Sequence, residues 1–463
     1  MKKTTKQNGL KAIASFAAAF LMISCAILIF TDDEDDGSND VLGAGVSPVI
    51  SASGSSYFAV KDDGTLWSWG ANNYGMLGDG TTTGGRMTPE QVKGPGGIGY
   101  LTDVKTVTAG WYHILALKND GTVWTWGFNN VGQLGDGTTV NRSTPVQVPI
   151  SEVKAITAGS YHSVALKTDG TVWTWGGGTS GQLGNGASLD SSMPVQVEGV
   201  GGSGNLIGVK AIASGSAFCL AVKNDGAVVS WGSNTYGQLG NGESGSGTNK
   251  NAPVNVMISA TTPLTGGDSV AAGHYHSLAM LNDGTVRAWG YNEQGQLGSG
   301  SSATLSASPV LALTNAAMID AGGYNSLAVK KDGTLWSWGS GSFGQIGDGD
   351  SVSRNAPVQV LDLTDARLIA VSQGCSLALK DDGTVWAWGD NQHGLLGIDT
   401  ITKSETPMCL SGFSLTTGSE STGGEEGVGG GGSVDILLVI VAIISVAALA
   451  VSAVTLLKMR GRP

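Results

Sequence analysis

The chain has 463 residues, 74 glycines and a formal net charge of −12 at neutral pH, and only 13% of its residues are charged. Soluble domains usually contain about 7% Gly and about 25% charged residues, so this composition favours a fold with many tight turns. The acidic balance argues against nucleic acid as a partner, because nucleic-acid recognition requires a basic face.

The first 46 residues have the pattern of an export segment followed by a linker. Four lysines near the start precede an apolar run at 12–30, and an acidic cluster follows at 32–36. This order places the basic end of such a segment in the cytoplasm. Residues 1–30 are therefore predicted to be a signal peptide or an N-terminal anchor, with both alternatives open, and residues 31–46 an acidic, glycine-containing linker.

Between residues 47 and 413 a unit of roughly fifty residues recurs seven times, which is the period of a four-stranded propeller blade. Each copy contains an Asp-Gly pair, a Trp-x-Trp-Gly run or a variant of it, and a Gly-Gln-Leu-Gly element or a variant of it; most copies add a Pro-Val element. The Trp-rich runs end at Trp69, Trp126, Trp175, Trp231, Trp289, Trp338 and Trp388.

Each repeated element has a physical interpretation. Asp-Gly between two β-rich runs is a strong hairpin signal and predicts a type I′ turn, in which both central residues have positive φ. In the run that follows, Trp124 and Trp126 share one face of a strand. Twelve of the 13 tryptophans occupy these two positions and are predicted to pack between blades. The even spacing of short strands predicts an all-β, seven-bladed propeller.

Three cysteines lie within the repeats, at 219, 375 and 409. An odd number without metal-ligand spacing predicts neither a disulfide framework nor a zinc site. A single disulfide between Cys375 and Cys409 stays open at this stage.

The C-terminal residues have the pattern of a membrane anchor. Residues 414–433 are rich in Gly, Ser, Thr and Glu and are predicted to be a flexible tether. Residues 434–457 contain one acid and no base and are predicted to be a transmembrane helix, and residues 458–463 a basic cytoplasmic tail. Since basic residues mark the cytoplasmic side, both ends predict a propeller outside the cell membrane.

The pattern Ala-Gly-x-x-His-Ser-x-Ala-Leu-Lys-x-Asp-Gly-Thr-Val-Trp-x-Trp-Gly, followed by Gly-Gln-Leu-Gly and Pro-Val-x-Val, resembles the repeat of the regulator of chromosome condensation family, which includes alpha-tubulin suppressor-like proteins. The resemblance covers about residues 49–413 and implies a seven-bladed propeller, here of a prokaryotic, membrane-anchored type. Family members commonly close the ring with one blade that mixes strands from both termini, and residues 47–50 and 407–410 are the candidates. The family includes exchange factors for a small GTPase and secreted bacterial inhibitors of β-lactamase, but no site residue of either group matches a position here.

The histidines are predicted to be structural. His113, His162 and His276 occupy one repeat position, which holds Ser, Phe, Asn or Cys in the other copies. A catalytic base or a metal ligand would not tolerate Phe there. His274 and His393 lie outside this position and are predicted to be exposed.

The sequence predicts no catalytic site and no cofactor. No Gly-x-Ser-x-Gly elbow, phosphate loop or His-Glu-x-x-His stretch is present. The segment 348–350 lacks most ligands of a calcium loop and is predicted to be a polar turn.

Aromatic residues in the loops are the candidate partner-binding residues. Tyr and Trp are enriched at binding hot spots; the alternative is that these rings only cover neighbouring blades. Irregular insertions at 94–102, 199–208 and 256–268 mark further loops in which function concentrates. The candidates are Trp111, Tyr112, Tyr161, Tyr275 and Tyr324 before a strand, and Tyr74, Tyr236 and Phe343 beside the Gly-Gln-Leu-Gly elements, with Phe128 and Tyr291 nearby.

The predicted function is therefore that of a surface-anchored propeller, a monomer outside the cell, whose loops on one rim bind an extracellular protein, peptide or glycan. The alternative is a structural envelope or spacer component; a hydrolytic enzyme or a GTPase exchange factor is disfavoured. The sequence names neither the ligand, nor the binding rim, nor the organism.

Overall fold

The computed structural model describes residues 49–53, 56–372, 374–391 and 402–414. All of them belong to the first of two compact units, Met1–Thr417; the second unit, Gly418–Pro463, lies outside the described residues. The predicted export segment at 1–30, the linker, the tether, the transmembrane helix at 434–457 and the cytoplasmic tail also lie outside them. Within the described ranges, no helix is both long and apolar enough to cross a bilayer.

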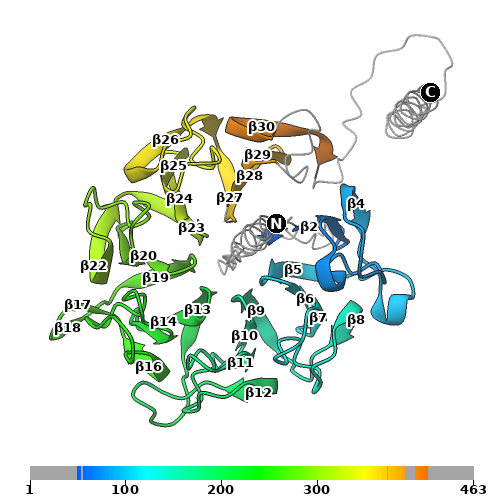
Figure 1. The fold of residues 1–463 in the computed structure, drawn as a ribbon, viewed down its shortest axis with the longest axis horizontal. Coiled ribbons are helices and arrows are strands. Elements are labelled where there is room, and N and C mark those ends of the chain that lie inside the picture. The colour runs from blue at the N-terminus through cyan, green and yellow to red at the C-terminus, as the bar shows by residue number, and fades with distance from the viewer. Residues whose placement is uncertain (1–48, 54–55, 373, 392–401, 415–463) are drawn as a thin grey trace, which may run out of the picture. The chain divides into compact units, whose positions relative to one another are not determined.

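The described residues form seven antiparallel, four-stranded sheets arranged around a central axis, which confirms the predicted seven-bladed propeller (Figure 1). Each blade consists of consecutive strands, with the first nearest the axis and the fourth at the periphery. The blades are, in order, β1 (Val49–Ser53), β2 (Ser56–Val60), β3 (Leu66–Gly70), β4 (Arg86–Gln91); β5 (Val104–Ala109), β6 (His113–Lys118), β7 (Val123–Gly127), β8 (Arg142–Gln147); β9 (Val153–Ala158), β10 (His162–Lys167), β11 (Val172–Gly176), β12 (Ser191–Gln196); β13 (Val209–Ser214), β14 (Phe218–Lys223), β15 (Val228–Gly232), β16 (Lys250–Asn255); β19 (Gly267–Ala272), β20 (His276–Leu281), β21 (Val286–Tyr291), β22 (Leu305–Leu313); β23 (Ala316–Gly322), β24 (Asn325–Lys330), β25 (Thr334–Gly339), β26 (Arg354–Thr364); β27 (Ala366–Val371), β28 (Cys375–Lys380), β29 (Thr384–Asp390), β30 (Lys403–Ser414).

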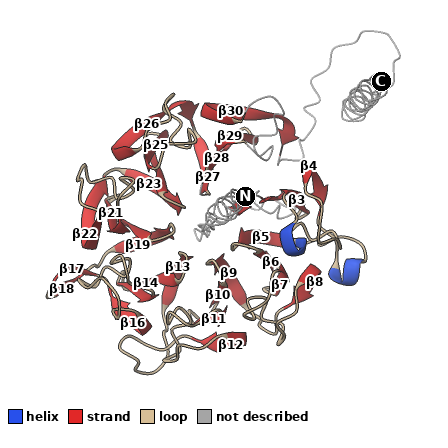
Figure 2. Cartoon of the chain, viewed as in Figure 1, coloured by secondary structure: helices blue, strands red, loops and turns tan. Residues whose placement is uncertain are grey.

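The three predicted insertions lie in connections between the last strand of one blade and the first strand of the next. Residues 94–102 contain the 3-10 turn η2 (Pro95–Gly97), and η1 (Asn73–Gly75) is the other helical turn among the described residues (Figure 2). Within residues 199–208, Asn205 forms an isolated antiparallel bridge with Glu198. Residues 256–268 contain the small hairpin of β17 (Met257–Ser259) and β18 (Thr262–Pro263).

A buried tryptophan from the third strand of each blade fills the junction with the preceding blade. Trp175, for example, is completely buried among Leu115, Leu117 and other side chains of the preceding blade. Its Nε1–H donates to the Gln133 carbonyl at 3.0 Å, in the Gly-Gln-Leu-Gly loop of that blade. The same bond recurs in five further junctions, from Trp126, Trp231, Trp289, Trp338 and Trp388.

The last glycine of the Gly-Gln-Leu-Gly loop makes room for this indole. A Cβ atom on Gly135 would lie 2.6 Å from Trp175 Nε1, and Gly135 has a φ of +68°. Any residue other than glycine would be strained at this positive φ, and its Cβ atom would displace the tryptophan. The first tryptophan of each pair lies farther out: Trp173 is only partly buried, and its Nε1–H donates to Thr171 Oγ1 at 3.2 Å.

The repeated histidines are buried and hydrogen-bonded at strand starts, as predicted. His113 Nε2 lies 3.0 Å from Ser163 Oγ, and that hydroxyl donates to the Gln133 carbonyl at 2.8 Å. Since the serine proton is used there, His113 donates from Nε2. Burial lowers the pKa of His113 to about 3, so its imidazole is neutral at neutral pH. His276 contacts Ser326 Oγ in the same way, and His162 Nε2 lies 3.2 Å from Cys219 Sγ.

The predicted type I′ geometry of the Asp-Gly turns is wrong. In the turn at 118–122, Gly121 has a φ of +77°, but Asp120 does not have positive φ. Gly121 N donates to the Lys118 carbonyl at 3.0 Å, and Lys118 N to the Thr122 carbonyl at 2.9 Å. This is a three-residue loop that ends in a left-handed glycine. The physical reason is the Asp120 carboxylate, which accepts hydrogen bonds from Thr122 N and Thr122 Oγ1 and thereby stabilises right-handed backbone.

The ring closes without exchanging strands, contrary to the closure that the family resemblance implied. The strand β1 pairs with β2, and β30 pairs with β29, so residues 49–50 and 407–410 belong to different blades. Among the described residues, side chains pack the last blade against the first. The contact includes Leu377, Leu379 and Val385 from the last blade and Tyr57 and Trp69 from the first.

The three cysteines among the described residues are free thiols, so Cys375 and Cys409 do not form a disulfide. Cys375 is buried, and its Sγ donates to the Asp390 carbonyl at 2.9 Å, whereas Cys409 is exposed. Burial raises the pKa of the Cys375 thiol to about 12.

Candidate binding face

The loops that hold the candidate aromatic residues come together on one face of the ring. One set, which we call the inner loops, joins the first and second strands of each blade; the other, the outer loops, joins the third and fourth strands. Tyr74 is in an outer loop and Tyr112 in the inner loop of the next blade, and their ring centroids are 5.3 Å apart. We refer to this side as the aromatic face. The Asp-Gly turns, which join the second and third strands, lie at the other end of the blades.

A belt of backbone hydrogen bonds links the inner loops from blade to blade. Trp111 N donates to the Ser160 carbonyl at 3.3 Å, and Ser160 N to the Ser216 carbonyl at 3.0 Å. Ser216 N then donates to the His274 carbonyl at 3.2 Å, and His274 N to the Gly323 carbonyl at 2.9 Å. The belt spans five blades and holds these loops in a fixed arrangement, which lowers the ordering cost of binding.

Five rings form the first aromatic cluster, which extends over the first three blades. Tyr74 packs on Phe128 at 4.4 Å between centroids, and Tyr112 lies 6.3 Å from Trp111. Trp111 meets Tyr161 edge-on at 5.1 Å. Tyr74 is 42% exposed, and the other four rings are partly buried. The cluster is therefore a continuous, partly exposed aromatic surface, and three of its rings lie in the inner loops that the backbone hydrogen bonds link.

The second aromatic cluster extends over the fourth, fifth and sixth blades and contains a residue whose predicted exposure is wrong. Tyr236 lies 4.9 Å from Tyr291 and 5.0 Å from Tyr275. His274 was expected to be exposed, but it is only 3% exposed, because it stacks on Tyr275 at 5.2 Å and meets Tyr324 edge-on at 5.0 Å. It occupies the repeat position of Trp111. His393 lies outside the described residues.

Phe343 is joined to neither cluster among the described residues. It is partly buried in the outer loop of the sixth blade, where its N–H donates to Gln345 Oε1 at 2.8 Å.

The rings of the aromatic face are uncharged at neutral pH, although the Tyr291 hydroxyl donates to the Glu293 carboxylate beside the second cluster. Burial raises the pKa of Tyr112, Tyr161 and Tyr275, and it raises the pKa of Tyr324 to about 12. Burial also lowers the pKa of His274 to about 3. These phenols and this imidazole are neutral, so they offer ring surface and hydrogen bonds rather than acid–base chemistry.

No grouping of three or more His, Cys, Asp or Glu side chains suited to a metal ion occurs in the part of the chain that the structure describes. The segment 348–350 is a polar turn, as predicted. Arg354 Nε donates to Asp348 Oδ2 at 2.6 Å, and Arg354 Nη2 to Asp350 Oδ2 at 3.1 Å.

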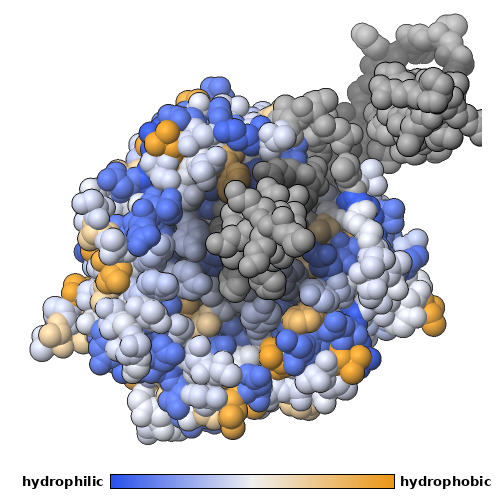
Figure 3. All heavy atoms as spheres, in the orientation of Figure 1, coloured by the Kyte–Doolittle hydropathy of each residue, from blue (hydrophilic) through white to orange (hydrophobic). Residues whose placement is uncertain are grey.

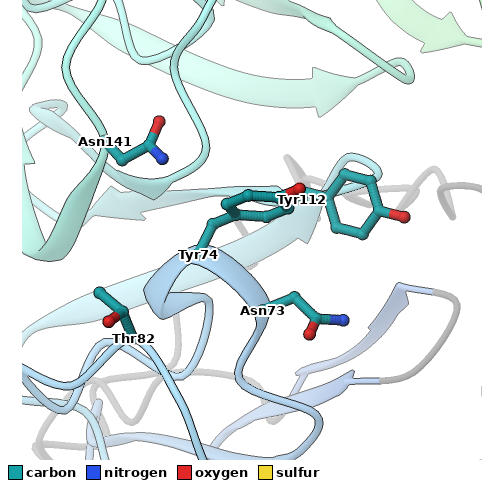
Figure 4. Close-up of a pocket in the computed structure, with 5 residues that line it drawn as sticks. All are labelled: Asn73, Tyr74, Thr82, Tyr112 and Asn141. Atoms are coloured by element: carbon teal, nitrogen blue, oxygen red, sulfur yellow. The ribbon is translucent and has the colours of Figure 1, made fainter.

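Apolar residues alone do not mark a site on the face shown in Figure 3, where they are scattered singly over a mainly hydrophilic surface. Single exposed apolar residues are normal for soluble proteins. The distinguishing feature is a pocket of about 610 Å³ beside the first aromatic cluster, lined by Asn73, Tyr74, Thr82, Tyr112 and Asn141 (Figure 4).

Sequence reasoning missed a buried asparagine that shapes the outer loops. Asn129 Oδ1 accepts from Leu134 N at 2.9 Å, and its Nδ2 donates to the carbonyls of Thr138 and Val140 at 3.1 Å. Asn72, Asn234 and Asn292 also accept the equivalent leucine N–H. The signal was available, because Trp-Gly-x-Asn occurs in five of the seven copies.

Comparison with known protein families identifies the repeat. The RCC1-like domain model matches residues 191–430, and the regulator of chromosome condensation (RCC1) repeat model matches residues 63–117 and 120–166. The chain belongs to the RCC1-like family. This confirms the family that the sequence pattern resembles.

The curated relatives are longer than the region that matches this chain. The chain is 31% identical over 244 residues to the ultraviolet-B receptor UVR8 of Arabidopsis thaliana, covering 53% of this chain and 41% of that one. It is 28% identical over 263 residues to the human E3 ubiquitin-protein ligase HERC2, covering 57% of this chain but 4% of that one. The matched region thus spans less than half the length of these relatives.

Solved structures show the same fold at low identity. Prp20p of Saccharomyces cerevisiae, described with its binding properties to Gsp1p and histones, has a TM-score of 0.63 and 22% identity, covering 75% of this chain and 86% of that one. Human WBSCR16 has a TM-score of 0.62 and 22% identity, covering 75% of this chain and 94% of that one. The RCC1-like propeller is a protein-interaction fold, and the propeller itself is a binding module rather than a catalyst.

Proposed function

We propose that this chain is a surface-anchored propeller that binds an extracellular protein partner through the aromatic face. The observation that carries the proposal is the pair of aromatic clusters, whose rings are partly exposed on a rigid belt of inner loops. Rigid aromatic side chains bury much surface at a small cost in conformational entropy. The anchoring part of the proposal rests on the sequence of the two ends, where basic residues flank apolar runs at 12–30 and 434–457.

The double substitution Trp111→Ala with Tyr112→Ala tests the binding face. Wild-type chain displayed on cells of its source should capture a partner that is identified by cross-linking and mass spectrometry. The double variant should lose that partner while its melting temperature stays within a few degrees of the wild type. Loss of folding instead would show that these rings only pack the neighbouring blades.

Tyr100→Ala provides a matched control. Tyr100 is 52% exposed, lies in the connection between β4 and β5, and belongs to neither aromatic cluster. Capture of the same partner by this variant is expected to equal that of the wild type. Protease treatment of intact cells tests the location separately: the propeller should be digested only if it lies outside, and complete protection refutes surface anchoring.

A further inference from the structure

The pocket beside the first aromatic cluster lies at an outer loop in which the first copy of the repeat departs from five of the others. In five other blades the glutamine of the Gly-Gln-Leu-Gly loop accepts a hydrogen bond from the backbone N–H two residues earlier, at 2.8 to 3.1 Å. The first blade has Met76 in place of this glutamine, and a thioether cannot hold Tyr74 N in that way.

Without that restraint the loop takes a different conformation. Tyr74 has a φ of 60° and a ψ of 17°, inside the 3-10 turn η1, whereas the residues at the same position in those five blades do not have positive φ. A bulky residue in left-handed backbone is uncommon and often marks a functional site. In this turn Tyr74 is 42% exposed. Its ring lines the pocket next to that of Tyr112 (Figure 4).

The pocket lining is uncharged and offers hydrogen-bond donors beside two rings. Asn141 Oδ1 already accepts from Asn129 N at 2.8 Å, so its Nδ2 group is the part left for a ligand. Asn73 adds a second amide, and Thr82, Tyr74 and Tyr112 add hydroxyl groups. No lysine, arginine or carboxylate is among the lining residues, so the pocket does not select a charged ligand.

We propose that this pocket binds a proline-rich segment of the partner in the polyproline II conformation, an inference that rests on the proposed function. A polyproline II segment has no internal hydrogen bonds, and proline has no N–H, so its backbone presents carbonyl acceptors to the donors of the pocket. Proline-rich segments are typically recognised in aromatic-lined grooves, because their preformed conformation loses little entropy on binding.

The spacing of the rings in the first aromatic cluster matches the rise of a polyproline II segment. Centroid separations of 5.3 and 6.3 Å lead from Tyr74 through Tyr112 to Trp111. One turn of polyproline II has three residues and rises about 9 Å. A segment seated in the pocket therefore reaches the rest of the first cluster within about one turn.

Fluorescence anisotropy with the purified full-length chain and a fluorescein-labelled decaproline peptide tests the proposal. Wild-type chain should bind decaproline and should not bind a ten-residue Ala-Ser peptide. Met76→Gln should weaken decaproline binding at least tenfold without lowering the melting temperature, because glutamine occupies this position in five other blades. Tyr74→Ala should weaken it similarly, and Tyr100→Ala should leave it unchanged.

Three outcomes would overturn the proposal: no binding of decaproline, equal binding by the wild type and Met76→Gln, or binding of the neutral glucan maltohexaose without binding of decaproline. These outcomes are separate from a failure of the proposed function. If Trp111→Ala with Tyr112→Ala abolishes partner capture although decaproline does not bind, the aromatic face binds protein but the ligand class inferred here is wrong.

Discussion

The indole N–H of the buried tryptophan column is expected to matter more than the identity of the outer tryptophans. Trp175→Phe removes the hydrogen bond to the Gln133 carbonyl and leaves a void at the blade junction. We expect the free energy of unfolding to fall by about 2 kcal/mol. Trp173→Phe, in the same strand, is the control. It removes a bond to Thr171 at a partly exposed position and should cost less than about 1 kcal/mol. Urea unfolding followed by circular dichroism measures both, and equal losses would contradict the role assigned to the junction.

Stability should depend on pH through the buried histidines. Burial lowers the pKa of His113, His162 and His276 to about 3, whereas a histidine in the unfolded chain titrates near 6.5. Below pH 6.5 the unfolded chain therefore binds protons that the folded chain does not. The free energy of unfolding should fall as the pH drops from 6.5 towards 3, by up to about 1.4 kcal/mol per pH unit for each such histidine.

The variant His113→Asn isolates one of these groups. Asparagine is already present at the equivalent position in the sixth blade, as Asn325, so the substitution is compatible with the repeat. Between pH 6 and 4, the free energy of unfolding of the variant should change less steeply with pH than that of the wild type. The difference should be about one proton, or about 1.4 kcal/mol per pH unit. The turn aspartates also contribute to the slope at the acidic end of this window, because threonine hydrogen bonds lower the pKa of residues such as Asp120 in the folded chain alone. Their contribution is the same in the wild type and in His113→Asn, so it cancels in the difference between the two slopes. An unchanged slope would mean that His113 is protonated in the folded state.

Residue-level prediction succeeded where one repeat position could be compared across copies. Phe218 in the histidine position showed that the position is apolar and buried, so His113 and its equivalents were assigned correctly. His274 was misassigned because its burial comes from Tyr275 and Tyr324, whose packing depends on two different blades. Comparing the same position in different copies does not show which side chains of neighbouring blades touch each other.

At the scale of the hairpin, Asp120→Gly distinguishes the observed turn from the predicted one. In a type I′ turn this substitution would relieve positive φ and be neutral or stabilising. In the observed loop Asp120 does not have positive φ, and its carboxylate holds Thr122 N at 3.0 Å and Thr122 Oγ1 at 2.6 Å. We expect a loss of about 1 kcal/mol in the free energy of unfolding. Asp225→Gly, in the equivalent turn, serves as a replicate, because Asp225 holds Ala227 N in the same way but has no hydroxyl partner. A smaller loss is expected there.

The existence of each hairpin was predictable, but its turn type was not. Asp-Gly shows where the chain reverses, because glycine supplies the left-handed residue that every such turn needs. Whether one residue or two adopt positive φ depends on the aspartate carboxylate, which accepts a hydrogen bond from the N–H two residues later, whether that residue is Thr122 or Ala227. Likewise, the Met76 variant of the Gly-Gln-Leu-Gly element was visible in the sequence, but its effect on Tyr74 required the side-chain hydrogen bonds of the other blades.

At the scale of the whole ring, periodicity fixes the number of blades but not the way in which the ring is closed. Every blade repeats the same local pattern, so the sequence does not distinguish a blade of four consecutive strands from one that borrows a strand from the other end. In the structure β30 pairs with β29 and β1 with β2, so the chain is covalently continuous across six junctions and not across the seventh. Among the described residues, side-chain packing holds the last blade against the first.

This seventh junction should be where the ring opens most readily, because no sheet is shared across it and no connection between consecutive strands crosses it. Amide hydrogen exchange followed by mass spectrometry should therefore show lower protection in β1–β4 and β27–β30 than in the blades between β9 and β22.

Leu377→Ala removes a side chain that packs in the seventh junction, and Leu220→Ala removes one from the junction between the fourth and fifth blades. Both substitutions are expected to cost about 2–5 kcal/mol in local packing. Leu377→Ala should speed exchange selectively in the first and last blades, whereas Leu220→Ala should not favour those blades. Uniform protection around the ring, or the same exchange pattern in both variants, would show that the seventh junction is as strong as the six that the chain itself spans.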